Sequence, residues 1–396
     1  MRRGAVFVTI VLATSGSLAS VAGATDGCEP LQPETCSIGE LAANLGIRFG
    51  TTLEDFEIAD SGYVSTLLED FTSITPENAL KLYATQSSRG TWNFAAADAV
   101  VAFAESEGLA IRGHTLVWAQ DNYTPAWVRA ISDPNELWTV TSTHITEVMT
   151  RYHGRITRWD VVNEPLATFG TGQSTSVMWN MGSDWIKRAF DLAHSLDPQA
   201  ELWINEFGTD WVPGKHQAFL TLVENLLDAG APIDGVGLQT HRLPGVAIDR
   251  RVFERQLRDF ANLGVKVAIT ELDVPVSPTD SGAFDWQATE YAKVVAACAA
   301  VSNCTEITVW GLSDRDTWLD GLGTFAVPTR PLLFDNNLQA KSAHASVRDE
   351  LARAIRARSL PATGEQTTTL VGLALAMIAS GVVLRPRRRT RSATRQ

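Results

Sequence analysis

The chain has 396 residues, of which 45% are hydrophobic, and a formal net charge of −12 at pH 7. That length fits either two average domains or one large (β/α) barrel. The acidic balance argues against a nucleic-acid partner, because the protein would repel phosphate. The sequence also contains no His-x-x-x-His or His-Glu-x-x-His pair, no Gly-x-Ser-x-Gly turn and no phosphate-binding glycine-rich loop. We therefore expect no metal, no cofactor and no serine nucleophile.

The first 24 residues have the pattern of a secretory signal peptide. Arg2 and Arg3 precede an apolar run over residues 5–13, and Ala22-Gly23-Ala24 forms a small-x-small cleavage site. We expect cleavage after Ala24 and export of the chain, which would then begin with a short N-terminal segment over residues 25–36.

Four cysteines in an exported chain favour disulfides over metal sites. Three pairings are possible, and we expect the two between sequence neighbours, Cys28–Cys36 and Cys298–Cys304. Neither pair has the Cys-x-x-Cys spacing of a zinc site, and each bond would close a short loop.

Between residues 37 and 355, short apolar runs alternate with helical patterns. One helical pattern covers residues 183–196, with Ser183 as a candidate N-cap, and another over residues 253–263 places Phe253, Leu257 and Phe260 on one face. Strand and helix alternating eight times predicts an α/β fold, a (β/α)8 TIM barrel that forms a single catalytic domain. The eight apolar runs span residues 47–51, 71–75, 110–117, 156–162, 201–205, 235–240, 265–270 and 306–311.

Two of these predicted strands end on a carboxylate. Residues 265–270 lead into Glu271-Leu272-Asp273, and residues 156–162 lead into Asn163-Glu164-Pro165. Burying an unpaired carboxylate is costly, so an acid at the tip of a buried strand needs a reason. A single Glu-x-Asp is more often an N-cap or a loop ion pair. Two carboxylates at the same end of one barrel, however, are the minimum equipment for breaking a glycosidic bond.

Other polar and aromatic residues also follow the predicted strands. Each has a structural interpretation when it is taken alone, because a lone His is usually hydrogen-bonded in a core and Trp is mostly buried. Gln239 and His241 alternate with Thr240 and should therefore share a face. Together, carboxylates, amides, imidazoles and flat indoles suit a neutral, hydroxyl-rich ligand with one apolar ring face, namely a sugar. These residues are Glu77, Asn78, Lys81, His114, Trp118, Asn205, Gln239, His241, Trp310 and Trp318.

Several sequence blocks carry a family resemblance. The main blocks are WDVVNEP at residues 159–165, ITELD at 269–273 and ITVWG at 307–311, with supporting blocks at residues 73–78, 112–118, 237–241 and 331–335. In this order they resemble the signature of glycoside hydrolase family 10, the endo-β-1,4-xylanases, over about residues 40–350. The resemblance implies a retaining enzyme with Glu164 as general acid/base and Glu271 as nucleophile, whose carboxyl groups would lie about 5–5.5 Å apart.

The resemblance also implies roles for the surrounding residues. His241 and Asp273 resemble the pair that keeps the nucleophile ionised and oriented, and Asn163 would hydrogen-bond the sugar 2-hydroxyl. The family carries a short disulfide just before the last strand, where Cys298 and Cys304 lie. The resemblance implies that the substrate is bound by Glu77, Asn78, Lys81, His114, Trp118, Asn163, Asn205, Gln239, Trp310 and Trp318.

The chain departs from the family pattern at three places. Ala119 stands where a His is usual and is followed by a longer loop over residues 120–124, Leu82 stands where a Trp is common, and Glu206-Phe207 replaces an Asp-Tyr pair. These differences leave open the same retaining chemistry on another β-glycan or a plant β-glycoside. A non-catalytic carbohydrate-binding surface protein is a third possibility, which the presence of both carboxylates disfavours.

Residues 356–396 form a tether followed by a second targeting pattern. Leu360-Pro361-Ala362-Thr363-Gly364 precedes an apolar stretch over residues 370–384 and an arginine cluster over residues 385–391. This order resembles the cell-wall sorting signal of Gram-positive surface proteins, which a sortase cuts after Thr. It implies that Thr363 is joined to peptidoglycan, and a plain tail anchor is the alternative, although the stretch is shorter than the ~20 residues of a comfortable span.

Removing both ends would take away eight arginines and one glutamate, so the net charge would fall from −12 to −19. We expect a secreted, cell-wall-anchored monomer whose partners are xylan or a related β-linked polysaccharide, sortase and peptidoglycan.

Overall fold

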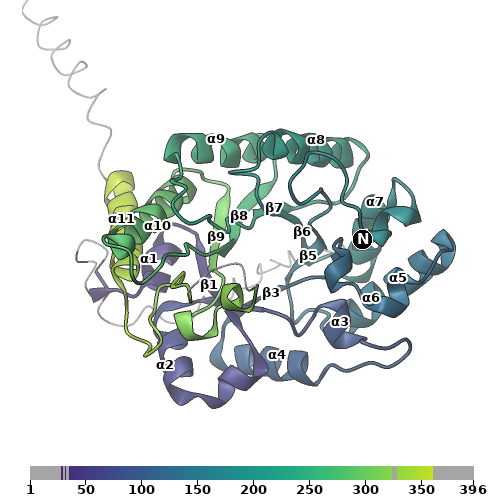
Figure 1. Cartoon of the computed structure of the whole chain (residues 1–396), viewed down its shortest axis with the longest axis horizontal. Helices are drawn as coiled ribbons and strands as arrows, with labels where there is room; N and C mark the ends of the chain where they lie inside the picture. Colours follow the sequence, from purple (N-terminus) through teal and green to yellow (C-terminus); the bar gives the residue numbers. More distant parts are fainter. Residues whose placement is uncertain (1–27, 30–31, 33–34, 323–327, 360–396) are drawn as a thin grey trace, which may run out of the picture.

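The fold is a closed barrel of parallel strands surrounded by helices (Figure 1). The computed structural model describes residues 28–29, 32, 35–322 and 328–359. Each strand pairs in parallel with its sequence neighbour, except that β3 and β4 do not pair with each other. Strand β1 pairs with β9, and β3 pairs with β5, which closes the ring. The strands are β1 (Arg48–Leu53), β2 (Ser73–Pro76), β3 (Ala110–Gly113), β4 (Val117–Trp118), β5 (Arg158–Asn163), β6 (Glu201–Glu206), β7 (Gly235–Leu238), β8 (Lys266–Leu272) and β9 (Cys304–Val309).

The predicted (β/α)8 barrel is confirmed, and apart from one run that is split, the strand ends lie within two residues of the predicted runs. The run predicted over residues 110–117 is split into β3 and the two-residue β4, which pairs only with the last part of β5. The strand predicted over residues 235–240 stops at Leu238, because Thr240 has a φ of 63°, in the left-handed region that ends extended structure. Both differences occur at strand ends, where the chain leaves the sheet to form the loops of the site.

The helices cover the outside of the barrel (Figure 1). In α9 the buried positions are Phe253, Leu257 and Phe260, as the sequence predicts. The predicted N-cap Ser183 is wrong, because α7 begins at Trp185 and its N-cap residue is Asp184, whose side chain makes no capping hydrogen bond. The helices are α1 (Ile38–Asn44), α2 (Ser61–Asp70), α3 (Leu82–Thr85), α4 (Ala95–Glu107), α5 (Ala126–Arg129), α6 (Pro134–Arg151), α7 (Trp185–Leu196), α8 (Lys215–Asp228), α9 (Arg250–Ala261), α10 (Ala283–Ala299) and α11 (Ser342–Ser359).

The barrel interior contains a network of buried charges. Arg112 on β3 pairs with Asp160 on β5 and, at 2.9 Å, with Glu306 on β9. Because β3 and β9 are not hydrogen-bonded to each other, the second pair crosses the interior. Arg158 reaches the same Glu306 carboxylate at 2.6 Å. Burial alone raises the pKa of Glu306, but the charges of Arg158 and Arg112 hold it below its ordinary value. The interior is therefore held by ion pairs, and removing one partner would leave an uncompensated buried charge, which is strongly destabilising.

Both expected disulfides are present. Cys28 is bonded to Cys36, and Cys298 at the end of α10 is bonded to Cys304 at the start of β9. The predicted signal peptide over residues 1–24 and the sorting signal with Thr363 lie outside the described residues. Helix α11 ends at Ser359, directly before the predicted pentapeptide. In the described part of the chain, no helix combines the length and the apolar character needed to cross a membrane.

Candidate active site

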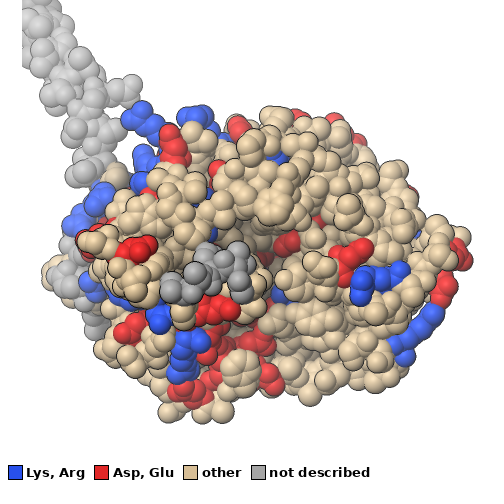
Figure 2. All heavy atoms as spheres, viewed as in Figure 1, with Lys and Arg blue, Asp and Glu red and all other residues tan. Residues whose placement is uncertain are grey.

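A cavity of about 530 Å³ lies where the strands end and their loops begin. The face of the molecule seen in Figure 2 is hollowed near its centre, and acidic atoms are visible in the depression. Twelve of the fourteen residues predicted for catalysis, nucleophile support or substrate binding line this cavity, and the other two, Asn205 and Asp273, lie directly behind them. The twelve are Glu77, Asn78, Lys81, His114, Trp118, Asn163, Glu164, Gln239, His241, Glu271, Trp310 and Trp318.

Glu271, near the end of β8, is buried and held by donors on both oxygens. Asn205 Nδ2 donates to Oε1 at 2.6 Å, and His241 Nε2 lies 3.1 Å from Oε2. Burial by itself raises the pKa of Glu271, but the hydrogen bond from His241 and the positive charges of His241 and Lys81 help to hold this pKa below its ordinary value. Glu271 is therefore an ionised carboxylate at neutral pH.

The cation beside Glu271 is the imidazolium of His241, which Asp273 stabilises. His241 Nδ1 lies 2.7 Å from Asp273 Oδ2, which also accepts a hydrogen bond from Trp318 Nε1 at 2.9 Å. Burial lowers the pKa of His241, but the charge of Asp273 and the hydrogen bonds to both carboxylates raise it to about 10. The imidazole is therefore protonated at neutral pH and donates from both nitrogens, so the series Asp273–His241–Glu271 alternates in charge.

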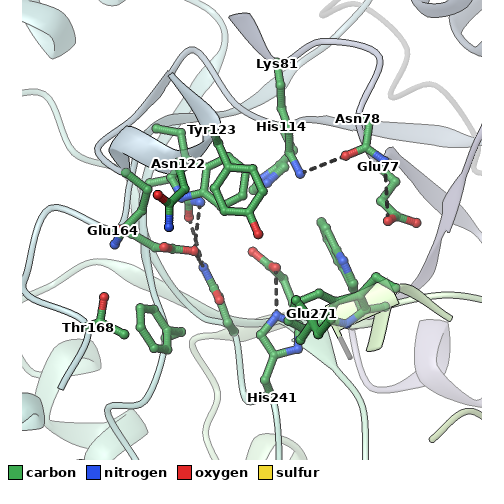
Figure 3. A pocket seen from close by; sticks show the side chains of 18 of the residues that line it. Glu77, Asn78, Lys81, His114, Asn122, Tyr123, Glu164, Thr168, His241 and Glu271 are labelled. Carbon is green, nitrogen blue, oxygen red and sulfur yellow. Dashed lines mark hydrogen bonds and ion pairs between the residues drawn. The ribbon is translucent and has the colours of Figure 1, made fainter. Parts of the chain in front are cut away.

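A relay of side-chain amides connects Glu271 to Glu164. Asn205 Nδ2 donates to Asn163 Oδ1 at 2.9 Å as well as to Glu271, and Gln239 Nε2 donates to Asn163 Oδ1 at 3.1 Å and to Glu164 Oε1 at 2.9 Å. The ends of β5, β6 and β8 and the segments that directly follow β5 and β7 thus contribute one connected group of polar atoms. Figure 3 shows the Glu164 and Glu271 carboxylates entering the same cavity from two sides.

The backbone conformation at two strand ends orients the side chains of this relay. Glu164 has a φ of 56°, and Thr240, between Gln239 and His241, has a φ of 63°. Such conformations are uncommon for residues other than Gly and concentrate at functional sites. Gly237 is also required, because a Cβ there would lie 2.2 Å from Asn205 Oδ1, which accepts a hydrogen bond from Thr270. Gln239 and His241 do share the cavity wall as predicted, although a turn rather than strand alternation places them there.

A second wall of the cavity is formed after β2. Lys81 Nζ lies 3.3 Å from Asn78 Oδ1, which also accepts from the Tyr83 hydroxyl, and Asn78 Nδ2 donates to Glu54. Burial and the nearby charge of Glu54 raise the pKa of Glu77 to about 7. This wall therefore offers amide, ammonium and carboxyl groups, which match the hydroxyls of a sugar.

The sequence reasoning missed several lining residues. Most belong to loops, where neither hydrophobic periodicity nor a motif marks them, although the unusual length of the 120–124 loop was a signal. Tyr83 and Glu54, which hold Asn78, were also missed. The additional lining residues are Gln120, Asn122, Tyr123, Thr168, Phe207, Gly321 and Leu322.

The three departures from the family pattern have structural explanations. Neither Ala119 nor Leu82 lines the cavity, and Ala119 is fully buried with its backbone N–H bonded to Asn163 O at 2.9 Å. Glu206 is fully buried and pairs with Lys215 at 3.0 Å, and its other oxygen accepts from Leu166 N at 3.0 Å. Burial raises the pKa of Glu206 to about 7, with the charge of Lys215 opposing the rise and the charge of Glu164 adding to it. Glu206 thus holds the segment just after Glu164 in place and does not line the cavity.

Potential metal ligands are sparse. Within the described ranges, the group of suitable side chains close enough to share an ion is Cys28, Cys36 and Glu40. Both sulfurs of that group are joined in a disulfide, so neither can act as a thiolate ligand.

Comparison with known proteins finds relatives that match over most of this chain. An endo-1,4-beta-xylanase from Agaricus bisporus is 35% identical over 319 residues, covering 79% of this chain and 94% of the relative. Endo-1,4-beta-xylanase 2 from Claviceps purpurea is 36% identical over 335 residues, covering 84% of this chain and 95% of the relative. Among solved structures, native xylanase 10B from Thermotoga maritima matches with a TM-score of 0.74 and 30% identity, covering 81% of this chain and 99% of that one. The sequence profile of glycosyl hydrolase family 10 matches residues 37–350, and the chain therefore belongs to glycosyl hydrolase family 10.

Proposed function

We propose that the protein is a retaining endo-β-1,4-xylanase with Glu271 as nucleophile and Glu164 as general acid/base. The observation that carries this proposal is the contrast between two buried carboxylates that share one cavity. Glu271 contacts an imidazolium and an amide donor, whereas the side-chain contacts of Glu164 are the neutral amides of Asn163 and Gln239. Glu271 is thus stabilised as an anion by a cation, whereas Glu164 has no charged hydrogen-bond partner in the described part of the chain, and two carboxylates in such different surroundings suit the separate roles of nucleophile and acid/base in double displacement.

In the first step, a Glu271 oxygen attacks the anomeric carbon while Glu164 donates its proton to the leaving glycosidic oxygen. A glycosyl-enzyme ester then forms and the Glu271 charge disappears. Glu164, now ionised, removes a proton from water, which attacks the same carbon and releases Glu271. Two inversions give net retention of configuration.

The relay amides and the second wall orient the sugar. Asn163 is suited to the 2-hydroxyl, because its Oδ1 is already fixed by two amide donors and its Nδ2 faces Glu164. A contact to this hydroxyl strengthens as positive charge develops on the ring. The remaining substrate contacts in this proposal come from Glu77, Asn78, Lys81, His114, Trp118, Gln239, Trp310 and Trp318, with Asn205 acting through Asn163 and Glu271.

Proton NMR of xylohexaose hydrolysis tests the chemistry. The newly released reducing ends should appear first as the β-anomer, and initial release of the α-anomer would contradict double displacement. Glu271→Ala should abolish turnover. Glu164→Ala should be slow on xylan yet recover activity on an aryl β-xyloside when azide is added, with β-xylosyl azide as product. Comparing initial rates on xylan, cello-oligosaccharides and aryl β-glucosides tests the substrate, and the reading as a xylanase fails if xylan is the poorest of the three.

We also propose that the enzyme is exported and joined to peptidoglycan through Thr363 as a monomer. The order of pentapeptide, apolar stretch and arginine cluster supports this, as does the position of Ser359 at the end of α11, next to Leu360. In a sortase-containing Gram-positive host, muramidase digestion should release the chain linked to wall fragments. Thr363→Ala should lose that linkage, whereas a plain tail anchor would leave both forms in the detergent-soluble membrane fraction.

A further inference from the structure

Both faces of the Trp118 indole are already occupied by the protein itself. The ring of Tyr123 lies parallel to the Trp118 ring, with an interplanar angle of 9° and a centroid separation of 3.9 Å. Lys81 Nζ lies 4.6 Å from the centroid of the same indole. Two groups at these distances cannot share one face of a ring, so Tyr123 covers one face and Lys81 the other. Trp118 therefore has no face left on which a sugar ring could stack, and its contact with a substrate is limited to the edge of the ring.

The loop that carries Tyr123 is held in place at several points. It follows β4 and contains a short 3-10 turn over Asp121–Tyr123. Asp121 Oδ1 accepts a hydrogen bond from Val177 N at 2.8 Å, and Thr124 O accepts from Arg129 Nε at 3.1 Å. The loop is thereby tied to neighbouring segments on both sides of Tyr123, so its ring is fixed before any ligand arrives, which lowers the entropy lost on binding.

Tyr123 belongs to the wall of the catalytic cavity. It lines the same cavity as Glu164 and Glu271, and 40% of the residue is exposed. In Figure 3 its hydroxyl points into the cavity on the side of the two carboxylates. Burial and the charge of Glu164 raise the pKa of Tyr123, as expected if the phenol lies near the acid/base. Because it stacks on Trp118, the ring also moves this wall inward by 3.9 Å, one ring thickness.

We propose that Tyr123 is a specificity-determining residue, whose exposed ring face stacks on a xylosyl ring beside the scissile bond and whose bulk selects unsubstituted stretches of the xylan chain. This inference rests on the proposed function. The C–H faces of xylopyranose are apolar and suit an aromatic platform, and a wall displaced inward by one ring leaves less space for side groups on O2 or O3. Tyr123 thus takes over the stacking that Trp118 cannot provide.

Steady-state kinetics of Tyr123→Ala on two substrates test the inference. The substrates are linear xylohexaose and a xylo-oligosaccharide that carries one arabinosyl group on O3. The KM for the linear substrate should rise about tenfold, the size expected when one aromatic stacking contact is lost, with kcat within about threefold of the parent. The KM for the arabinosyl substrate should rise less, so that the preference for the linear chain falls. Tyr123→Phe should keep the parent's preference for the linear chain over the arabinosyl substrate, because it retains the ring.

Phe169→Ala is the matched control, because Phe169 is an aromatic residue that is 79% exposed and does not line the cavity. Tyr123→Leu repeats the comparison if the alanine variant does not fold. An unchanged KM for xylohexaose overturns the inference, and so does an equal loss of kcat on both substrates, which would indicate that Tyr123 only supports Trp118. Failure of the proposed function has a different signature, because the parent enzyme would then turn over neither oligosaccharide.

Discussion

Replacing Asp273 by Asn tests how the protein keeps Glu271 ionised. The substitution preserves the shape of the side chain and leaves one oxygen to accept from Trp318, but it removes the charge that raises the pKa of His241 to about 10. Burial then favours the neutral imidazole, and Glu271 loses the cation that lies 3.1 Å from its Oε2. The pKa of Glu271 should therefore rise from its depressed value.

The size of the effect follows from the lost interaction. A hydrogen bond to a charged group contributes about 1.5–3 kcal/mol, and one pKa unit corresponds to about 1.4 kcal/mol, so the pKa of Glu271 should rise by roughly one to two units. A carboxylate with a depressed pKa is ionised above that pKa, and the ionised form is lost as the pH falls through it. The acidic limb of the kcat/KM profile should thus move to higher pH by the same amount, while the rate on the alkaline side of that limb changes much less.

The assay is kcat/KM for xylohexaose between pH 3 and 9, about the range in which carboxylates and His titrate, with folding checked by circular dichroism at each pH. Asp259→Asn is the control, because Asp259 pairs with His216 at 2.9 Å on the outer helices. That variant should keep the parent profile. An acidic limb that stays in place in Asp273→Asn, or a loss of equal size at every pH, would refute the reasoning.

Three further changes probe the scaffold and the cavity wall. Gly237→Ala should lower kcat/KM by about 100-fold, because the new Cβ would lie 2.2 Å from Asn205 Oδ1 and must displace the relay. A kcat/KM for xylohexaose equal to that of the parent would contradict this. Glu306→Gln should reduce the free energy of unfolding in guanidinium by about 3–5 kcal/mol. Glu105→Gln, at an exposed ion pair, should reduce it by only about 0–1 kcal/mol. Equal losses would show that the buried ion pairs contribute no more to stability than the exposed one. Lys81→Met should also move the acidic limb of the pH profile to higher pH, but by less than Asp273→Asn. The charge of Lys81 lowers the pKa of Glu271 less than the hydrogen bond from His241 does.

The architecture and the candidate catalytic acids could be predicted from the sequence because both are marked by patterns among residues that are near one another in the chain. A strand is marked by consecutive apolar residues, and a carboxylate at its end is conspicuous because burial penalises it, as with Glu271 after β8. Short loop closure likewise made the two disulfides predictable. These features depend on neighbours within a few residues, so they need no knowledge of the barrel.

Only the tertiary structure decided how the acids are held and what surrounds the substrate. The amide relay joins side chains from β5, β6, β7 and β8, and its contacts depend on the register of the closed barrel and on the turn at Thr240. Tyr123 covers Trp118 only because a loop is fastened to a segment some fifty residues away, at Val177. Strand periodicity sets which residues are buried, whereas contacts between distant loops arise from packing in three dimensions, which no local pattern records.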